Sequence, residues 1–184
     1  MKKYLLFLMV FVFFNLSFAA DGEKRIAAVC AGCHGTNGAS VGDSIPIIGG
    51  QSEDYLKKVM KEYSEDKRVG SVMLKVAKGY DDKRIEYIAK YFSKQKWVSS
   101  NKPFDKKLAE EGEKIAVICF DCHGKNGKGM DEYPRIAGQH AFYLKQVLKE
   151  YKDGINKNDE MSLLKEYSDE QIEALANYFS SIRQ

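Results

Sequence analysis

Residues 30–38 read CAGCHGTNG, and residues 119–127 read CFDCHGKNG. The two stretches share the pattern Cys-x-x-Cys-His-Gly followed by Asn-Gly. Together they hold all four cysteines and two of the three histidines of the chain. A pattern repeated in this way predicts two related halves that carry the same chemistry.

The repeat extends well beyond the cysteine motifs. PIIGGQ at 46–51 matches PRIAGQ at 134–139, KEY at 61–63 matches KEY at 149–151, and AKYFS at 89–93 matches ANYFS at 176–180. Between the copies, residues 96–105 lose the helical pattern and collect Ser, Asn and Pro, which is typical of a linker. We therefore predict a tandem duplication of a small domain, with domains at 20–97 and 105–184 and a linker at 98–104.

Each half has the apolar periodicity of helices, and neither has an alternating pattern typical of strands. We expect helices over 23–34 and 110–123 that end in the cysteine motifs, and amphipathic helices over 52–63 and 140–151. The last helix should begin at Ser168 with a capping box to Gln171, and its counterpart at Asp81 or Asp82. Residues 35–50 are rich in Gly and Ser and predict a loop. The expected fold class is all-α.

The first twenty residues, MKKYLLFLMVFVFFNLSFAA, have two lysines, an apolar run and small residues around Ser17 and Ala19. This is typical of a secretory signal peptide over 1–19, cleaved near Ala19. A retained membrane anchor is the alternative, although the run is shorter than the roughly 20 residues that span a bilayer. Without Lys2 and Lys3 the chain has 27 basic and 26 acidic residues. Since no basic block alternates with aromatics, nucleic acid is not an expected partner.

The duplicated cysteine motif has four interpretations. Disulfides suit an exported chain with an even number of cysteines but leave the adjacent histidines unexplained. A thioredoxin-like redox site would need a βαβ pattern, and zinc would need four ligands where each cluster offers three. Attachment of c-type haem uses Cys-x-x-Cys-His, and it also gives a small domain the core that it lacks. We therefore predict two covalent haems, with thioethers at Cys30, Cys33, Cys119 and Cys122 and iron ligands at His34 and His123.

A haem that transfers electrons commonly has a second axial ligand, and a methionine there raises the potential. Met73 and Met161 each lie 27 residues after the proline of their half, so the repeat makes them equivalent. Met60 falls opposite Leu148 on an apolar stripe, where we expect core packing, and Met130 has no methionine counterpart. We predict Met73 and Met161 as the second ligands. The alternative is that both are only buried apolar residues.

Three further side chains could serve the same site. His140 could ligate iron, but its counterpart in the first half is Ser52, which cannot. Because His140 begins a predicted helix, we expect it at the surface or in a capping role. Arg68 and Arg135 are expected on the solvated surface, and pairing with haem propionates is the alternative.

With CAGCHG and CFDCHG, PIIGGQ and PRIAGQ, and Met73 and Met161 in equivalent positions, the chain resembles the dihaem cytochrome c4 family. The resemblance implies two tandem class I cytochrome c domains, each a small helical fold around one haem, in a periplasmic electron carrier that is not an enzyme. It also implies that the carbonyls of Pro46 and Pro134 accept hydrogen bonds from the haem-ligating histidines.

The resemblance also implies the partners. The donor would be a membrane quinol-oxidising complex or another cytochrome, and the acceptor a terminal oxidase or another redox protein. An alternative is the dihaem subunit of a flavoprotein dehydrogenase, such as a sulfide dehydrogenase. A haem peroxidase and a disulfide-bonded domain without haem are further alternatives. The loops before Met73 and Met161 differ most between the halves, so we expect two different potentials.

Overall fold

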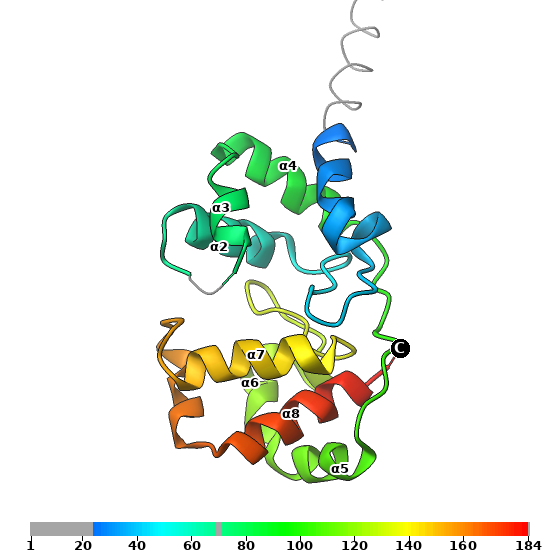
Figure 1. Ribbon diagram of the computed structural model, residues 1–184, viewed down its shortest axis with the longest axis vertical. Helices are drawn as coiled ribbons and strands as arrows, with labels where there is room; N and C mark the ends of the chain where they lie inside the picture. The colour runs from blue at the N-terminus through cyan, green and yellow to red at the C-terminus, as the bar shows by residue number, and fades with distance from the viewer. Residues whose placement is uncertain (1–23, 69–70, 184) are drawn as a thin grey trace, which may run out of the picture.

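The computed structural model describes residues 24–68 and 71–183 (Figure 1). The predicted signal peptide lies outside these residues. In the part described, the chain is helical and has no strand, apart from an isolated bridge between Met130 and Tyr133. None of the helices found there is long and apolar enough to cross a membrane.

The first half has a helix over residues 24–34, a short 3-10 turn η1 (Thr36–Gly38) and three further helices: α2 (Glu53–Ser64), α3 (Met73–Ala77) and α4 (Asp82–Ser93). The predicted apolar faces form its core. Leu56 and Met60 of α2 pack with Ile85 and Phe92 of α4. The prediction for Met60 is thus confirmed, since only 7% of it is exposed.

The second half repeats this order in its own helices: α5 (Lys106–Ile115), η2 (Val117–Cys119), α6 (Phe120–His123), η3 (Lys125–Gly127), α7 (Ala141–Lys152), η4 (Glu160–Glu166) and α8 (Asp169–Ser181). Its core holds Leu144 of α7 and the α8 residues Ile172, Leu175 and Phe179. Helices α5 and α8 cross closely at Gly112, where an added Cβ would lie 2.2 Å from the carbonyl oxygen of Ala174.

Helix starts follow the sequence, whereas one predicted helix is broken. Ser168 and Gln171 form the predicted capping box, and Asp81 caps α4. The helix expected over 110–123 instead divides into α5, the 3-10 turn η2 and α6. The break coincides with Val117 and Ile118, whose β-branched side chains crowd a helical turn. The first half has Ala28 at the position of Val117, and its helix runs on to residue 34.

Figure 1 shows the two halves stacked, with α2 of the first half and α7 of the second facing each other across the boundary. The chain passes between them along one edge, through residues 96–105 without a helix. The C-terminal end lies against this segment, where the guanidinium of Arg183 donates to the carbonyl oxygen of Lys102 and stacks over the Phe104 ring.

Candidate cofactor site

A cavity with mainly apolar walls runs through the interior of both halves. Its lining includes His34 and Met73 of the first half, and His123 and Met161 of the second. Three of the four cysteines also line it: Cys30, Cys119 and Cys122. Cys33 is exposed and is not part of the lining. The structure therefore brings each pair of histidine and methionine to the walls of one continuous space.

The two histidines are held in the same way by the loop that follows each motif. His34 donates from Nδ1 to the carbonyl oxygen of Pro46 at 2.9 Å, and His123 donates to Pro134 at 2.8 Å. Both predicted hydrogen bonds are thus confirmed. Burial lowers the pKa of both imidazoles, which keeps them neutral, as a metal ligand must be. With Nδ1 committed to the carbonyl, Nε2 is the nitrogen left for a metal.

All four cysteines are free thiols, and the first cysteine of each motif has a raised pKa. Burial raises the pKa of Cys30, and it raises that of Cys119 to about 11. A thiol–disulfide exchange site needs a lowered thiol pKa, so the redox interpretation of Cys-x-x-Cys has no support in this environment. None of the four cysteines is joined to another in a disulfide.

The two methionines occupy equivalent places, as the repeat predicts. Met73 is the first residue of α3 and packs against the core of the first half. Met161 lies in η4 and packs against the core of the second half. Each backbone N–H is held by a polar side chain just upstream, Ser71 at 3.2 Å and Asn158 at 2.8 Å. By contrast, Met130 is 46% exposed.

Residues of the Pro-x-x-x-Gly-Gln motif lie between the halves. Gly50 and Gly138 have positive φ values of 77° and 74°, and their N–H groups donate to the helix ends at Phe92 and Phe179. An added Cβ at Gly138 would lie 2.5 Å from the Ser99 hydroxyl, so this tight turn requires glycine. The turns direct the glutamines that follow into the boundary between the halves, where only a few per cent of each is exposed: Gln51 and Gln139.

Arg68 corrects one expectation from the sequence. It was expected on the solvated surface, yet only 5% of it is exposed. Its Nη1 donates to the Tyr151 hydroxyl at 3.1 Å, and its guanidinium lies over the rings of Tyr63 and Tyr151. Its Nε is buried without a hydrogen-bond partner and lies in a residue that lines the cavity. Such an orphaned cationic donor suits an anionic group of a cofactor, such as a haem carboxylate.

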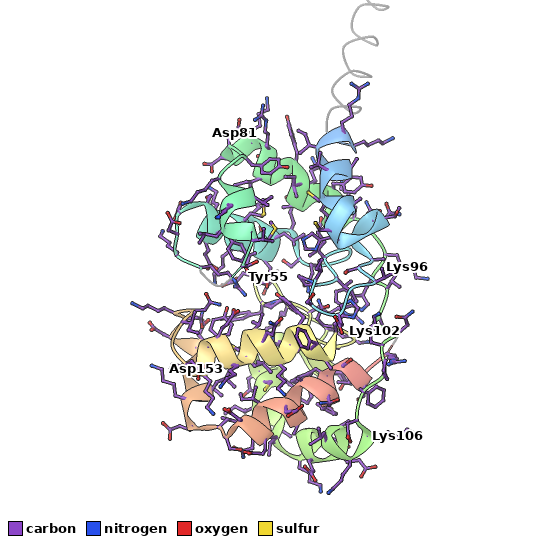
Figure 2. All side chains as sticks on the ribbon, in the orientation of Figure 1. Tyr55, Asp81, Lys96, Lys102, Lys106 and Asp153 are labelled. Atoms are coloured by element: carbon purple, nitrogen blue, oxygen red, sulfur yellow. The ribbon has the colours of Figure 1, made fainter. Side chains whose placement is uncertain are left out.

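Tyrosines of both halves surround Arg68. Figure 2 shows Tyr55 at the boundary between the halves. Burial raises the pKa of Tyr55 to about 12, and it raises that of Tyr143 well above the usual value. Both side chains are therefore neutral near neutral pH. This cluster is not evident in either half alone, because the docking of the halves creates it.

His140 corrects a second expectation. It was expected at the surface or as a helix cap, but it is fully buried and its side chain does not cap α7. Its Nε2 donates to the carbonyl oxygen of Ser40 at 3.1 Å, and its Nδ1 accepts from the Ser100 hydroxyl at 2.7 Å. Both ring nitrogens are thus occupied by protein groups. Arg135, also expected on the surface, is half-buried and stacks over the ring of Trp97.

The lining fits a planar, largely apolar cofactor with an iron centre. It combines neutral imidazoles and thioethers of methionine, which are ligands suited to iron in haem, with the thiols that covalent attachment of c-type haem requires. The histidine and methionine of each half are separate in sequence, and the same cavity has both in its walls.

Comparison with known proteins gives consistent matches. The sequence pattern of the cytochrome c family matches residues 19–101 and again 109–183. Cytochrome c4 of Pseudomonas aeruginosa is 32% identical over 180 residues, covering 89% of this chain and 88% of that protein. A thiosulfate dehydrogenase electron acceptor of Thiomonas intermedia is 30% identical over 173 residues, covering 84% of this chain and 79% of that protein. The crystal structure of reduced cytochrome c4 from Pseudomonas stutzeri superposes with a TM-score of 0.79 at 30% identity, covering 90% of this chain and 98% of that one.

Proposed function

The chain belongs to the dihaem cytochrome c4 family, and we propose that it shuttles single electrons between respiratory-chain partners in the periplasm. Members of this family are electron carriers with two covalently bound c-type haems. The donor is a membrane quinol-oxidising complex or another cytochrome, and the acceptor is a terminal oxidase or another redox protein. Export follows from the signal peptide at 1–19. The two haem domains occupy 20–97 and 105–184, with a linker at 98–104.

The proposed haem sites use equivalent residues in each half. Thioethers form at Cys30 and Cys33 in the first half, and at Cys119 and Cys122 in the second. His34 with Met73, and His123 with Met161, would hold the two iron atoms. When bound, each haem iron supplies one-electron exchange, and the protein sets its potential through the ligands, burial and hydrogen bonding.

The single observation that carries this proposal is the cavity whose walls contain His34, Met73, His123 and Met161. The fixed Nδ1 hydrogen bonds of both histidines support it, because they orient each imidazole for a metal on the opposite nitrogen. With a histidine and a methionine placed to hold each iron, the chain would supply two ligands per haem, which suits one-electron exchange without a bond to a substrate.

A second candidate function is electron acceptance from a dehydrogenase, either a flavoprotein such as a sulfide dehydrogenase or an enzyme that oxidises thiosulfate. It is favoured by relatives described as thiosulfate dehydrogenase electron acceptors, one of them 30% identical to this chain. The two functions differ in the donor, so reduction rates distinguish them. Faster reduction by a thiosulfate- or sulfide-oxidising enzyme than by a quinol-oxidising complex would favour the second.

The haem sites are tested on protein matured in a host that attaches c-type haem. We expect two covalent haems per chain by pyridine haemochrome assay and intact mass, and a count of zero or one would contradict the proposal. Met73→Leu and Met161→Leu should each retain two haems but shift one potential and weaken the far-red absorption band of methionine–iron ligation. Met60→Leu and Met130→Leu are the matched controls and should leave the band unchanged.

A further inference from the structure

The two glutamines of the repeated motif form a reciprocal contact between the halves. Gln139 accepts from the N–H of Ile47 at 3.0 Å and donates to the carbonyl oxygen of Ile47 at 2.9 Å. Gln51 accepts from the N–H of Arg135 at 2.9 Å and donates to the carbonyl oxygen of Arg135 at 2.7 Å. Each side-chain amide thus pairs with both backbone groups of one residue in the opposite half.

The residue that each glutamine contacts is the one after the proline of the opposite motif. The N–H of Ile47 belongs to the same peptide group as the carbonyl of Pro46, and that carbonyl accepts from His34. In the same way, the N–H of Arg135 shares a peptide group with the carbonyl of Pro134, which accepts from His123. One peptide group in each half therefore has a glutamine on one side and a histidine on the other.

Hydrogen bonds in such a chain strengthen one another. When a peptide N–H donates to an acceptor, its carbonyl becomes more negative and accepts more strongly, particularly in a buried setting. A stronger acceptor at Nδ1–H makes the imidazole a better electron donor to a metal on Nε2. Such a ligand stabilises oxidised iron relative to reduced iron and so lowers the reduction potential.

We propose that each glutamine is a positioning residue that tunes the haem of the opposite half: Gln139 acts through the Pro46–Ile47 peptide on His34, and Gln51 acts through the Pro134–Arg135 peptide on His123. The inference rests on the proposed haem ligation by these histidines. It makes the docking of the two halves a determinant of both potentials, and it assigns the effect of each substitution to a specific haem.

The direct test is a pair of substitutions in the haem-loaded protein, Gln139→Leu and Gln51→Leu. Gln51→Leu removes the acceptor of the Arg135 N–H, and Gln139→Leu removes the acceptor of the Ile47 N–H and also that of the His140 N–H. The potentials are measured by a redox titration that is monitored by NMR. The NMR spectra assign each haem through contacts with side chains of its own half. We expect Gln139→Leu to raise the potential of the first-half haem more than that of the second. Gln51→Leu should raise the potential of the second-half haem more than that of the first.

The Nδ1–H proton of each axial histidine gives a second readout, which a purely structural role would leave unchanged. In the reduced protein we expect its resonance to shift upfield for His34 in Gln139→Leu and for His123 in Gln51→Leu. The control is Ser100→Ala, which disturbs a buried residue of the linker without touching either peptide. It should move neither potential preferentially.

The possible results separate clearly. A crosswise pattern in both variants supports the inference. Equal shifts of both haems, as general separation of the halves would produce, overturn it, as do shifts confined to the haem of the substituted half or no shift at all. Because the haem count and the methionine–iron band are measured on the same samples, failure of the proposed ligation would be recognised independently of this result.

Discussion

Arg68 is a cationic side chain buried between tyrosines of both halves, with a hydrogen bond to Tyr151 and a contact of 3.6 Å to a carboxylate oxygen of Glu62. We expect Arg68→Leu to lower the free energy of unfolding of the haem-loaded protein by about 1.5–3 kcal/mol, which is the range for hydrogen bonds to charged groups. The substitution leaves the Tyr151 hydroxyl without this donor and the Glu62 carboxylate without its cation. Chemical denaturation followed by the Soret absorption measures the change.

Arg84 provides the matched control for this substitution. Its side chain is 54% exposed, and it lies 3.9 Å from Asp81 in a surface pair on α4. Arg84→Leu should change the free energy of unfolding by less than about 0.5 kcal/mol, because exposed pairs contribute little. Equal losses in the two variants would show that the buried position of Arg68 has no special energetic role.

Single residues also show what sequence reasoning can reach. The equivalence of Met73 and Met161 follows from a repeat that is visible in the sequence, whereas the hydrogen bonds of the two histidines to prolines were expected only from the resemblance to the cytochrome c4 family. The burial of Arg68 and His140 could not be predicted from the sequence, because the surface that covers each side chain belongs to the other half or to the linker. A weak signal existed for Arg68, since tyrosines recur at equivalent positions of α2 and α7.

At the scale of the elements, α8 of the second half and α2 of the first half both begin at a serine cap, but the two caps differ in geometry. The Ser168 hydroxyl accepts from the N–H of Gln171 at 3.2 Å, and the side-chain oxygen of Gln171 accepts from the N–H of Ser168 at 2.8 Å. We expect Ser168→Ala to lower the free energy of unfolding by about 1 kcal/mol, because it leaves an N-terminal N–H of α8 without its partner. Thermal and chemical unfolding of the haem-loaded protein both measure this.

The cap of α2 offers a graded comparison. Ser52 accepts from the N–H of Tyr55 at 3.4 Å, which is long for such a bond, and the structure shows no capping box there. Ser52→Ala should therefore cost less than Ser168→Ala. The reverse order would contradict the reading of these caps from their geometry.

The elements also separate what local sequence fixes from what packing fixes. Helix starts at Asp81 and Ser168 were predictable, because a capping side chain acts within a few residues of its own position. The division of the expected helix over 110–123 was not predictable in this way. Both copies end in the same Cys-x-x-Cys-His motif, so the motif predicts the same continuous helix in each half. The difference between Ala28 and Val117 coincides with the break, but propensity alone is a weak guide.

At the scale of the whole molecule, His140 joins three parts of the chain: its own second half, Ser40 of the first half and Ser100 of the linker. The carbonyl of Ser40 can only accept, so Nε2 carries the proton and Nδ1 accepts from Ser100. Burial lowers the pKa of His140 and outweighs the hydrogen bond to the Ser40 carbonyl, which raises it; Lys102 also lowers the pKa, and Asp43 raises it. The folded protein therefore holds this imidazole neutral.

The stability of the docked halves should consequently depend on pH through His140. Because its pKa is lower in the folded state, the unfolded chain binds more protons below about pH 6.5, and stability falls with falling pH by up to roughly 1.4 kcal/mol per pH unit. His140→Gln retains a donor and an acceptor but cannot titrate, so it should remove this part of the pH dependence. We expect the free energies of unfolding of the two proteins to differ most at pH 7.5 and to converge, or cross, as the pH falls toward 5. Curves that stay parallel over this interval would show that His140 protonates as readily in the folded protein as in the unfolded chain, and that its buried position between the halves carries no electrostatic cost.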